Sequence, residues 1–468
     1  MSRKCVVIVG GGPAGLYVAW RLAESGHKVE LVERREFLGG LCASPERGGN
    51  AYGYGFHGLH AADPAFVAQF HELMGKRWRE SEPRARVRIR TRFHDCPVGG
   101  WEFMCSMNPL VAAVCGAGLA GARFARPFRR GAPANAEQAL IRRYGRPLYR
   151  AVFRDDTSRF WGVHPSRLSA TLVQGCMPPL EAAGCCEKAT GRPGRRARPV
   201  KGRLPATGLA KLYCAPGGMG EICEAMARRV REAGGRIHTG TRVTRVRLEF
   251  GSVRAVVVQP AAGGVEVPCD LLVWTGPLGE LAEGMHPGAP PQVVGAARAL
   301  KFRALISVAL LVRKEQVFDS VLTYCHGRSF YRVAEPKHCG VDVTPPGCTA
   351  LLADVSCAPD ETSWEKPWSI ARRVAADLEA DGSIRADEIR EIYTFRARHA
   401  YPVYTLGFEQ RCETVQAYLD PIPNLLRVGR QATFSFMSAS AAMQSAWAAV
   451  STWLQGRCQA GKVSGVGW

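Results

Sequence analysis

A glycine-rich stretch near the N-terminus has the residue types and the spacing needed to hold a phosphorylated dinucleotide. It directly follows the β-branched run Val6–Val9. In such a turn the first glycine permits the tight bend, the second lets the backbone approach a diphosphate, and the third lets the next helix pack on the strand. The N-terminus of that helix attracts phosphate. We therefore assign five residues to the cofactor site: Gly10, Gly12, Pro13, Ala14 and Gly15.

An acidic residue ends the second expected strand of the same unit. Apolar residues recur at helical spacing from Leu16 to Ala23, Gly26 ends that pattern, and 28–33 reads as a strand ending in Glu33. Glu33 is expected to accept a hydrogen bond from a ribose hydroxyl. Arg34 comes next and is also assigned to the cofactor site. Because an arginine at this position can accommodate a ribose phosphate, a cofactor with a phosphorylated ribose remains an alternative.

The segment after this acid favours FAD over a nicotinamide cofactor. Residues 39–42 read Gly-Gly-Leu-Cys, which resembles the double-glycine segment that lies against the flavin diphosphate in amine-oxidase-like flavoproteins. That resemblance implies that Gly40 and Leu41 contact FAD.

Composition limits the class of protein. The chain has 468 residues, of which 46% are hydrophobic, so we expect a globular protein of two or three domains. We predict neither a leader peptide nor a membrane-spanning segment, and we expect a cytoplasmic location. The 17 cysteines are scattered without the paired spacing of a zinc site, so we expect reduced thiols and no metal.

A net charge of +21 could attract nucleic acid, anionic lipid or phosphorylated substrates. Much of the excess lies between Lys188 and Arg203, in a segment also rich in glycine and proline, which predicts a flexible basic loop over about residues 186–205. Aromatic residues do not alternate with these arginines, so we predict no specific nucleic-acid partner.

The expected fold class is α/β, with a discontinuous Rossmann-like FAD-binding domain. We assign to it residues 1–60, 213–276 and 394–468, with a mainly helical insertion at 61–212 and an antiparallel-sheet substrate region at 277–393. The second segment of the FAD-binding domain contributes Val243 to the expected cofactor site. The third contributes Gly429 and Arg430 at a glycine turn, and Met443 in a small-residue-rich helix expected from about Ser440 to Leu454.

Four stretches outside the nucleotide motif resemble one group of flavoproteins, which includes UDP-galactopyranose mutase, protoporphyrinogen oxidase and the amine oxidases. The resemblance covers nearly the whole chain. The four stretches are residues 55–60, with His57 and His60; residues 141–162, with Trp161; residues 329–338, with Arg332; and residues 400–404, with Tyr401 and Tyr404.

The resemblance implies a role for each of these residues. The two histidines would lie beside the flavin, where a neutral imidazole can accept a proton. Arg332 would hold a diphosphate, because a guanidinium offers a fixed fork of donors. Trp161 would cover a flat group such as uracil, and Tyr401 and Tyr404 would line the same pocket.

The chain also departs from this pattern. Where mutase relatives carry an arginine-tyrosine pair and an aspartate, this sequence has Ser435-Phe436 and Ser440. Asp156 replaces the aromatic residue usual before Thr157. These changes count against nucleotide-sugar specificity.

Three functions therefore remain open. The favoured hypothesis is an FAD-dependent oxidoreductase in which flavin N5 accepts a hydride from a small molecule, with His57 or His60 taking the accompanying proton. The first alternative is a sugar mutase that uses reduced FAD without net redox change, on a phosphorylated or nucleotide-linked substrate. The second is a flavin-bound structural or regulatory protein whose basic loop engages an anionic partner.

Overall fold

The computed structural model describes residues 3–60, 63–89, 92–96, 104–174, 211–259 and 264–456. The expected basic loop at 186–205, together with Cys176, Cys185 and Cys186, lies outside these residues.

A five-stranded parallel sheet collects strands from the three separated segments that the sequence assigned to the FAD-binding domain. The strand order is β10-β2-β1-β14-β21, and all four neighbouring pairs run parallel. The strands are β1 (Cys5–Val9), β2 (Lys28–Val32), β10 (Arg236–His238), β14 (Leu271–Trp274) and β21 (Leu425–Arg427). The buried aliphatic residues of β1, β2, β14 and β21 are typical of a sheet covered on both faces. The predicted α/β fold class is thus confirmed.

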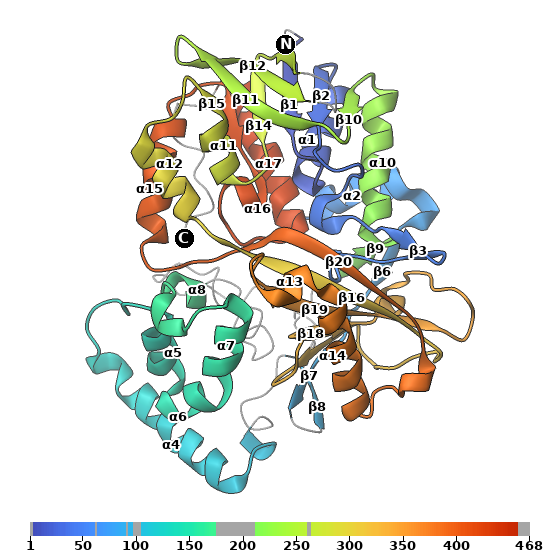
Figure 1. Cartoon of the computed structure of the whole chain (residues 1–468), viewed down its shortest axis with the longest axis vertical. Coiled ribbons are helices and arrows are strands. Elements are labelled where there is room, and N and C mark those ends of the chain that lie inside the picture. Colours follow the sequence, from blue (N-terminus) through green and yellow to red (C-terminus); the bar gives the residue numbers. More distant parts are fainter. Residues whose placement is uncertain are drawn as a thin grey trace.

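Helices and a second small sheet cover this parallel sheet (Figure 1). Helix α1 (Pro13–Glu24) packs between α10 (Gly218–Glu232) and α17 (Ala439–Leu454). The small sheet has the order β13-β12-β11-β15. Its strands are β11 (Arg242–Glu249), β12 (Ser252–Gln259), β13 (Val265–Pro268) and β15 (Met285–His286).

A seven-stranded sheet forms the other large layer, in the order β20-β16-β19-β18-β17-β7-β8. All neighbours pair antiparallel except β17 and β7. Its strands are β7 (Ala85–Ile89), β8 (Arg92–Asp95), β16 (Phe302–Val312), β17 (Leu322–Cys325), β18 (Arg332–Ala334), β19 (Thr349–Cys357) and β20 (Ile389–Pro402). Helix α14 (Pro367–Ala380) packs against β16 and β20.

The sheet differs from the predicted domain limits in two places. Strands β7 and β8 come from the segment 61–212, which we expected to be mainly helical. The limit drawn after residue 393 falls inside β20, a strand that the sequence analysis did not predict. β20 carries arginines on its exposed positions, and this polar face hides the pattern of a buried strand.

A separate group of helices lies at one end of the molecule (Figure 1). This group contains α4 (Pro109–Phe124), α5 (Ala136–Tyr144), α6 (Arg146–Leu148), α7 (Arg154–Trp161) and α8 (Thr171–Gln174). The helices outside this group include α2 (Pro64–Met74), α11 (Leu278–Gly284), α12 (Pro291–Ala299), α15 (Phe408–Leu419) and α16 (Gly429–Ala432). A further small sheet consists of the short strands β5 (Leu59–His60), β6 (Arg79–Ser81) and β9 (Leu212–Cys214).

In the described part of the chain, every helix is too short or too polar to span a bilayer. Nor do these ranges contain a group of three or more His, Cys, Asp or Glu side chains placed to hold a metal ion.

Candidate functional site

A cavity opens at the carboxyl ends of the parallel strands, where α/β sheets generally bind ligands. It encloses about 1230 Å³ of space, including its open mouth. Residues that follow β1, β2, β14 and β21 line it. The expected cofactor residues on this wall are Gly10, Gly12, Pro13, Ala14, Glu33, Arg34, Gly40, Leu41, Val243, Gly429 and Arg430.

The glycine turn has the geometry that a diphosphate requires. Gly10 has φ +107°, and a Cβ there would lie 2.1 Å from Thr275 Oγ1. At Gly12 a Cβ would have no heavy atom within 4 Å, because this position faces the cavity. Gly12 is also the N-cap of α1 and supplies no side-chain cap. The first N–H groups of α1 are therefore available to an anion in the cavity.

Gly15 has a structural role within the same turn. A Cβ at Gly15 would lie 2.0 Å from the carbonyl oxygen of Gly10, so only glycine fits between helix and strand. It does not line the cavity. The lack of a side chain at Gly15 therefore shapes the turn, and its contact with the cofactor stays a prediction.

Glu33 ends β2 with its carboxylate held by backbone amides. Its Oε2 accepts a hydrogen bond from the Gly11 amide at 2.6 Å, and its Oε1 accepts one from the Arg35 amide at 2.9 Å. These bonds fix the carboxylate at the cavity wall, where its remaining lone pairs can accept from a ribose hydroxyl.

The Gly39–Cys42 segment lies against the glycine turn, as the FAD prediction requires. The Gly39 amide donates to the carbonyl of Gly11 at 2.7 Å, and a Cβ at Gly40 would lie 3.1 Å from the Cα of Gly12. Cys42 also lines the cavity. Burial raises the pKa of its thiol to about 12, which keeps it protonated and unreactive as a nucleophile.

The C-terminal segment closes the other side of the cavity. Gly429 has φ +82° and brings the backbone against Ala14. Arg430 donates to the carbonyls of Ala400 and Met437, and its guanidinium lies over the rings of Tyr401 and Phe436.

The N-terminal turn of α17 lines the cavity through Ser438, Ala439 and Ala442. Met443, which the sequence analysis assigned to the cofactor, is fully buried against the α1 side and does not line the cavity. The sequence analysis also missed the cavity residues of Trp274–Pro277, although a polar Thr-Gly-Pro after a buried strand was a signal for them.

The two candidate catalytic histidines occupy different positions. His57 lines the cavity, while His60 does not, and the side chain of His60 is exposed on β5. His57 Nε2 lies 3.2 Å from the carbonyl oxygen of Tyr54. Because a carbonyl can only accept, Nε2 carries the proton and Nδ1 keeps its lone pair. Burial lowers the pKa of His57 to about 3, with further lowering by Arg332 and Arg430.

This lowered pKa predicts an acid-sensitive contribution to stability. Above pH 6.5 His57 is neutral in both the folded and the unfolded chain, but between pH 6.5 and about 3 only the unfolded chain takes up the proton. The free energy of unfolding should therefore fall by about 1.4 kcal/mol per pH unit over this window. Urea unfolding from pH 4.5 to 7 should show a weaker pH dependence in His57→Gln.

His338 supplies a control of opposite sign. The Glu335 carboxylate, 3.6 Å from the His338 ring, raises the pKa of His338, so the stabilising effect of His338 is present below pH 6.5 and is lost as the pH rises through the folded-state value. His338→Gln should change the pH dependence of unfolding in the direction opposite to His57→Gln. If both variants changed the pH dependence of unfolding in the same direction, the lowered pKa of His57 would be contradicted.

Arg332 belongs to a buried polar cluster beyond His57. Its Nε donates to Asp354 Oδ2 at 2.7 Å, and the Tyr331 hydroxyl lies 3.2 Å from the same oxygen. The hydroxyls of Tyr331 and Tyr401 are 2.8 Å apart. Burial raises the pKa of Asp354, whereas the charge of Arg332 lowers it. The positive charge of Arg332 thus has a carboxylate partner inside the protein.

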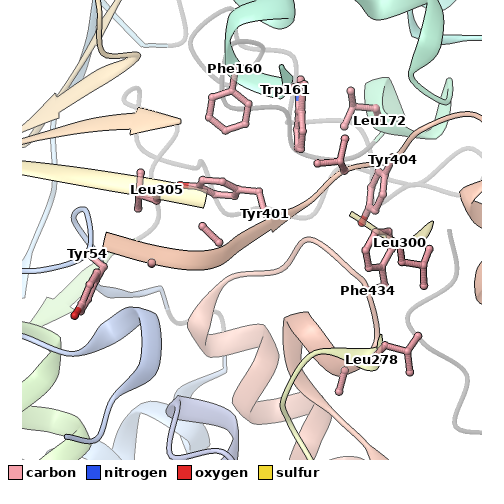
Figure 2. Packing of buried hydrophobic residues seen from close by; sticks show 14 of the residues in the cluster. Tyr54, Phe160, Trp161, Leu172, Leu278, Leu300, Leu305, Tyr401, Tyr404 and Phe434 are labelled. Atoms are coloured by element: carbon pink, nitrogen blue, oxygen red, sulfur yellow. The ribbon is translucent and has the colours of Figure 1, made fainter. Parts of the chain in front are cut away.

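Trp161 and Tyr404 belong to the packed core around this cluster. Only 2% of Trp161 is exposed, and its ring packs edge-on against Phe160. The Tyr404 hydroxyl accepts a hydrogen bond from the Phe436 amide at 2.8 Å. Figure 2 shows Phe160, Trp161, Tyr401 and Tyr404 in this cluster. Arg332, Trp161, Tyr401 and Tyr404 do not line the large cavity.

The sequence pattern of the family described as flavin containing amine oxidoreductase matches residues 13–367. A probable UDP-galactopyranose mutase of Klebsiella pneumoniae is 26% identical over 182 residues, 37% of this chain and 45% of that protein. A phytoene dehydrogenase of Streptomyces griseus is 28% identical over 286 residues, 58% of this chain and 54% of that protein. The chain thus spans about half the length of these two relatives.

Solved structures share the fold over the full length. Reduced UDP-galactopyranose mutase superposes with a TM-score of 0.79 at 17% identity, covering 100% of this chain and 97% of that one. A putrescine oxidase variant superposes with a TM-score of 0.65 at 14% identity, covering 97% and 99%.

Proposed function

Because the chain belongs to the flavin containing amine oxidoreductase family and binds FAD, we propose that it oxidises a small molecule by removing a hydride from a C–H bond. When bound, FAD supplies the two-electron acceptor for this reaction, or in its reduced form a nucleophile for the second candidate considered below. The glycine turn and α1 would hold the diphosphate, Glu33 a ribose, and the Gly39–Cys42 segment would lie along the cofactor.

The observation that carries the proposal is a neutral, oriented imidazole in the cavity. The Tyr54 carbonyl fixes the tautomer of His57 and leaves a lone pair on Nδ1. The low pKa keeps that lone pair free at working pH. A substrate that loses a hydride from carbon and a proton from an attached nitrogen or oxygen can pass this proton to Nδ1.

Four aromatic side chains pack around the Arg332–Asp354 pair, whose arginine is near enough to His57 to lower its pKa. The ring of Phe160 contacts those of Tyr331 and Tyr401, and the ring of Tyr401 contacts that of Phe436. These rings do not line the cavity, so they support the site through packing and not through contact with a substrate.

The sugar mutase is the second candidate, and Arg332 is the observation that favours it. Arg332 places a positive charge close enough to His57 to lower its pKa, so a cation stands near this end of the cavity. Two contacts count against a diphosphate ligand there. The Nε of Arg332 is paired with Asp354, and Arg430 donates hydrogen bonds to the backbone carbonyls of Ala400 and Met437.

A substrate panel decides between the two candidates. The purified holoenzyme is mixed anaerobically with amines, alcohols and cyclic hydrocarbons, and flavin bleaching near 450 nm is followed, which is roughly where oxidised flavins absorb. The chemically reduced enzyme is incubated with UDP-hexoses, and the products are separated by chromatography. We expect bleaching by at least one oxidisable substrate and no ring-isomerised sugar. Isomerised sugar from the reduced enzyme alone would replace the oxidoreductase proposal with the mutase.

A further inference from the structure

Helix α4 has an apolar face that no described part of the chain covers. Leu110 is 78% exposed, Val114 is 58% exposed and Phe124 is 81% exposed, and these positions recur at helical spacing on one side. Phe128, in the following turn η3 (Arg126–Phe128), is 85% exposed. We call Leu110, Val114, Phe124 and Phe128 the α4 face. Apolar residues this exposed and contiguous mark an interaction surface.

The opposite side of α4 is already packed. Cys115 and Ala122 are buried, and a Cβ at Gly118 would lie 2.7 Å from Pro147 Cδ. No charged residue occurs between Pro109 and Ala122, so both sides of the helix are apolar. An ordinary surface helix has a polar outer side, and one that is apolar all round is normally buried. Packing on the inner side therefore holds α4 in the fold, and the α4 face needs a separate binding partner to bury it.

Arginines surround one end of this face. Arg123, Arg126, Arg129 and Arg130 are all exposed, and the sequence has no Asp or Glu from Met104 to Ala136. Within the described ranges, the ion pairs do not include Arg123, Arg126 or Arg130. Arg129 donates to the carbonyl of Arg142 at 3.0 Å. A partner that binds the α4 face should therefore present negative charge next to an apolar layer.

We propose that the α4 face docks on an anionic lipid surface, with the phenylalanines entering the acyl boundary and the arginines meeting the headgroups. Exposed aromatic and aliphatic residues beside clustered arginines are the pattern of helices that lie in a membrane interface. Helix α4 lies at the outer edge of the helical group, so the bilayer would approach from that end (Figure 1).

Two other binding partners for the α4 face match its arginines less well. In a twofold dimer the same patch meets itself, and this patch holds no carboxylate to pair with its arginines. Residues 175–210 of the chain carry seven Lys or Arg, namely Lys188, Arg192, Arg195, Arg196, Arg198, Lys201 and Arg203, against two acids, Glu181 and Glu187. A net positive segment repels the arginines rather than neutralising them.

Vesicle flotation of the holoenzyme tests the proposal. Vesicles of phosphatidylcholine alone are compared with vesicles that also contain phosphatidylglycerol. We expect binding to the anionic vesicles, and weakening at high salt because the headgroup attraction is screened. Phe124→Asn/Phe128→Asn should reduce binding about tenfold or more through lost apolar burial. Arg126→Gln/Arg130→Gln should reduce it about thirtyfold, at roughly fivefold per arginine.

The matched control removes two exposed aromatics elsewhere in the chain. Phe250 is 97% exposed and Trp368 is 55% exposed, and Phe250→Asn/Trp368→Asn should bind vesicles as the parent does. Flavin content and circular dichroism check that each variant folds. The proposal would be overturned if the parent did not bind anionic vesicles, or if the Phe124/Phe128 variant bound them as well as the parent does. It would also be overturned if the parent were a dimer that bound no vesicles and the Phe124/Phe128 variant were a monomer.

Discussion

The Gly12→Val variant is expected to fold and to lose FAD. Gly12 has extended backbone angles, φ −78° and ψ 177°, which valine adopts readily. A Cβ there has no heavy atom within 4 Å, so the valine side chain would extend into the cavity. It would occupy the space next to the α1 amides that the diphosphate needs. We expect FAD affinity to fall by about a hundredfold or more, the cost of losing several charge-assisted hydrogen bonds.

Two further glycines make this experiment specific. Gly15→Ala should lose both FAD and folded structure, because its Cβ would lie 2.0 Å from the Gly10 carbonyl oxygen. Gly295→Ala, in α12 with nothing within 4 Å, should keep both. The flavin-to-protein absorbance ratio and the thermal unfolding of each FAD-stripped variant are the measurements. A Gly12→Val protein that retains one FAD per chain would show that the diphosphate binds elsewhere.

Local sequence patterns were sufficient to predict the elements that surround the expected cofactor site. The strand, the glycine turn, the helix and Glu33 follow one another within about thirty residues, so short-range geometry defines them. The Gly39–Cys42 segment was predicted for the same reason, since it follows β2 closely. Met443 shows the limit of this reasoning. Helix α17 was predicted, but which of its faces lines the cavity depends on how it packs against α1.

The substrate half depends on contacts between distant segments, which a single sequence does not reveal. Trp161 and Phe160 come from the helical region, whereas Tyr331 and Tyr401 come from the large sheet. Only the fold shows that their rings pack together and bury Trp161. Asp354 was not predicted for a similar reason: it lies inside the aliphatic strand β19 and becomes significant only through Arg332 on β18.

The two histidines show how a local strand sets side-chain direction. Leu59 and His60 form β5, which pairs with β9, and successive side chains on a strand point to opposite faces. Leu59 is buried and His60 is therefore turned outward. His57 precedes the strand and is free to face the cavity. A resemblance alone could not separate the two residues, since both lie in the same six-residue stretch.

This difference gives the second large prediction, a selective loss of flavin reduction in His57→Gln. The rate constant for flavin reduction by the substrate found in the panel should fall by about a hundredfold, the lower end of the range for acid-base catalysis, because a pKa of about 3 makes His57 a weak base. Glutamine can still donate to the Tyr54 carbonyl, so the local fold is preserved, but its amide cannot take the proton. The measurement is anaerobic stopped-flow absorbance.

His60→Gln is the matched control, three residues away and outside the cavity, and its reduction rate should equal that of the parent. The parent rate should also show no titration of His57 between about pH 5 and 9, because a group with a pKa of about 3 is neutral throughout that range. Equal rates in the parent and in His57→Gln would remove His57 from the proton transfer and with it the observation on which the proposed function rests. A loss in both variants would instead indicate that the stretch 55–60 acts through the fold, since only His57 reaches the cavity.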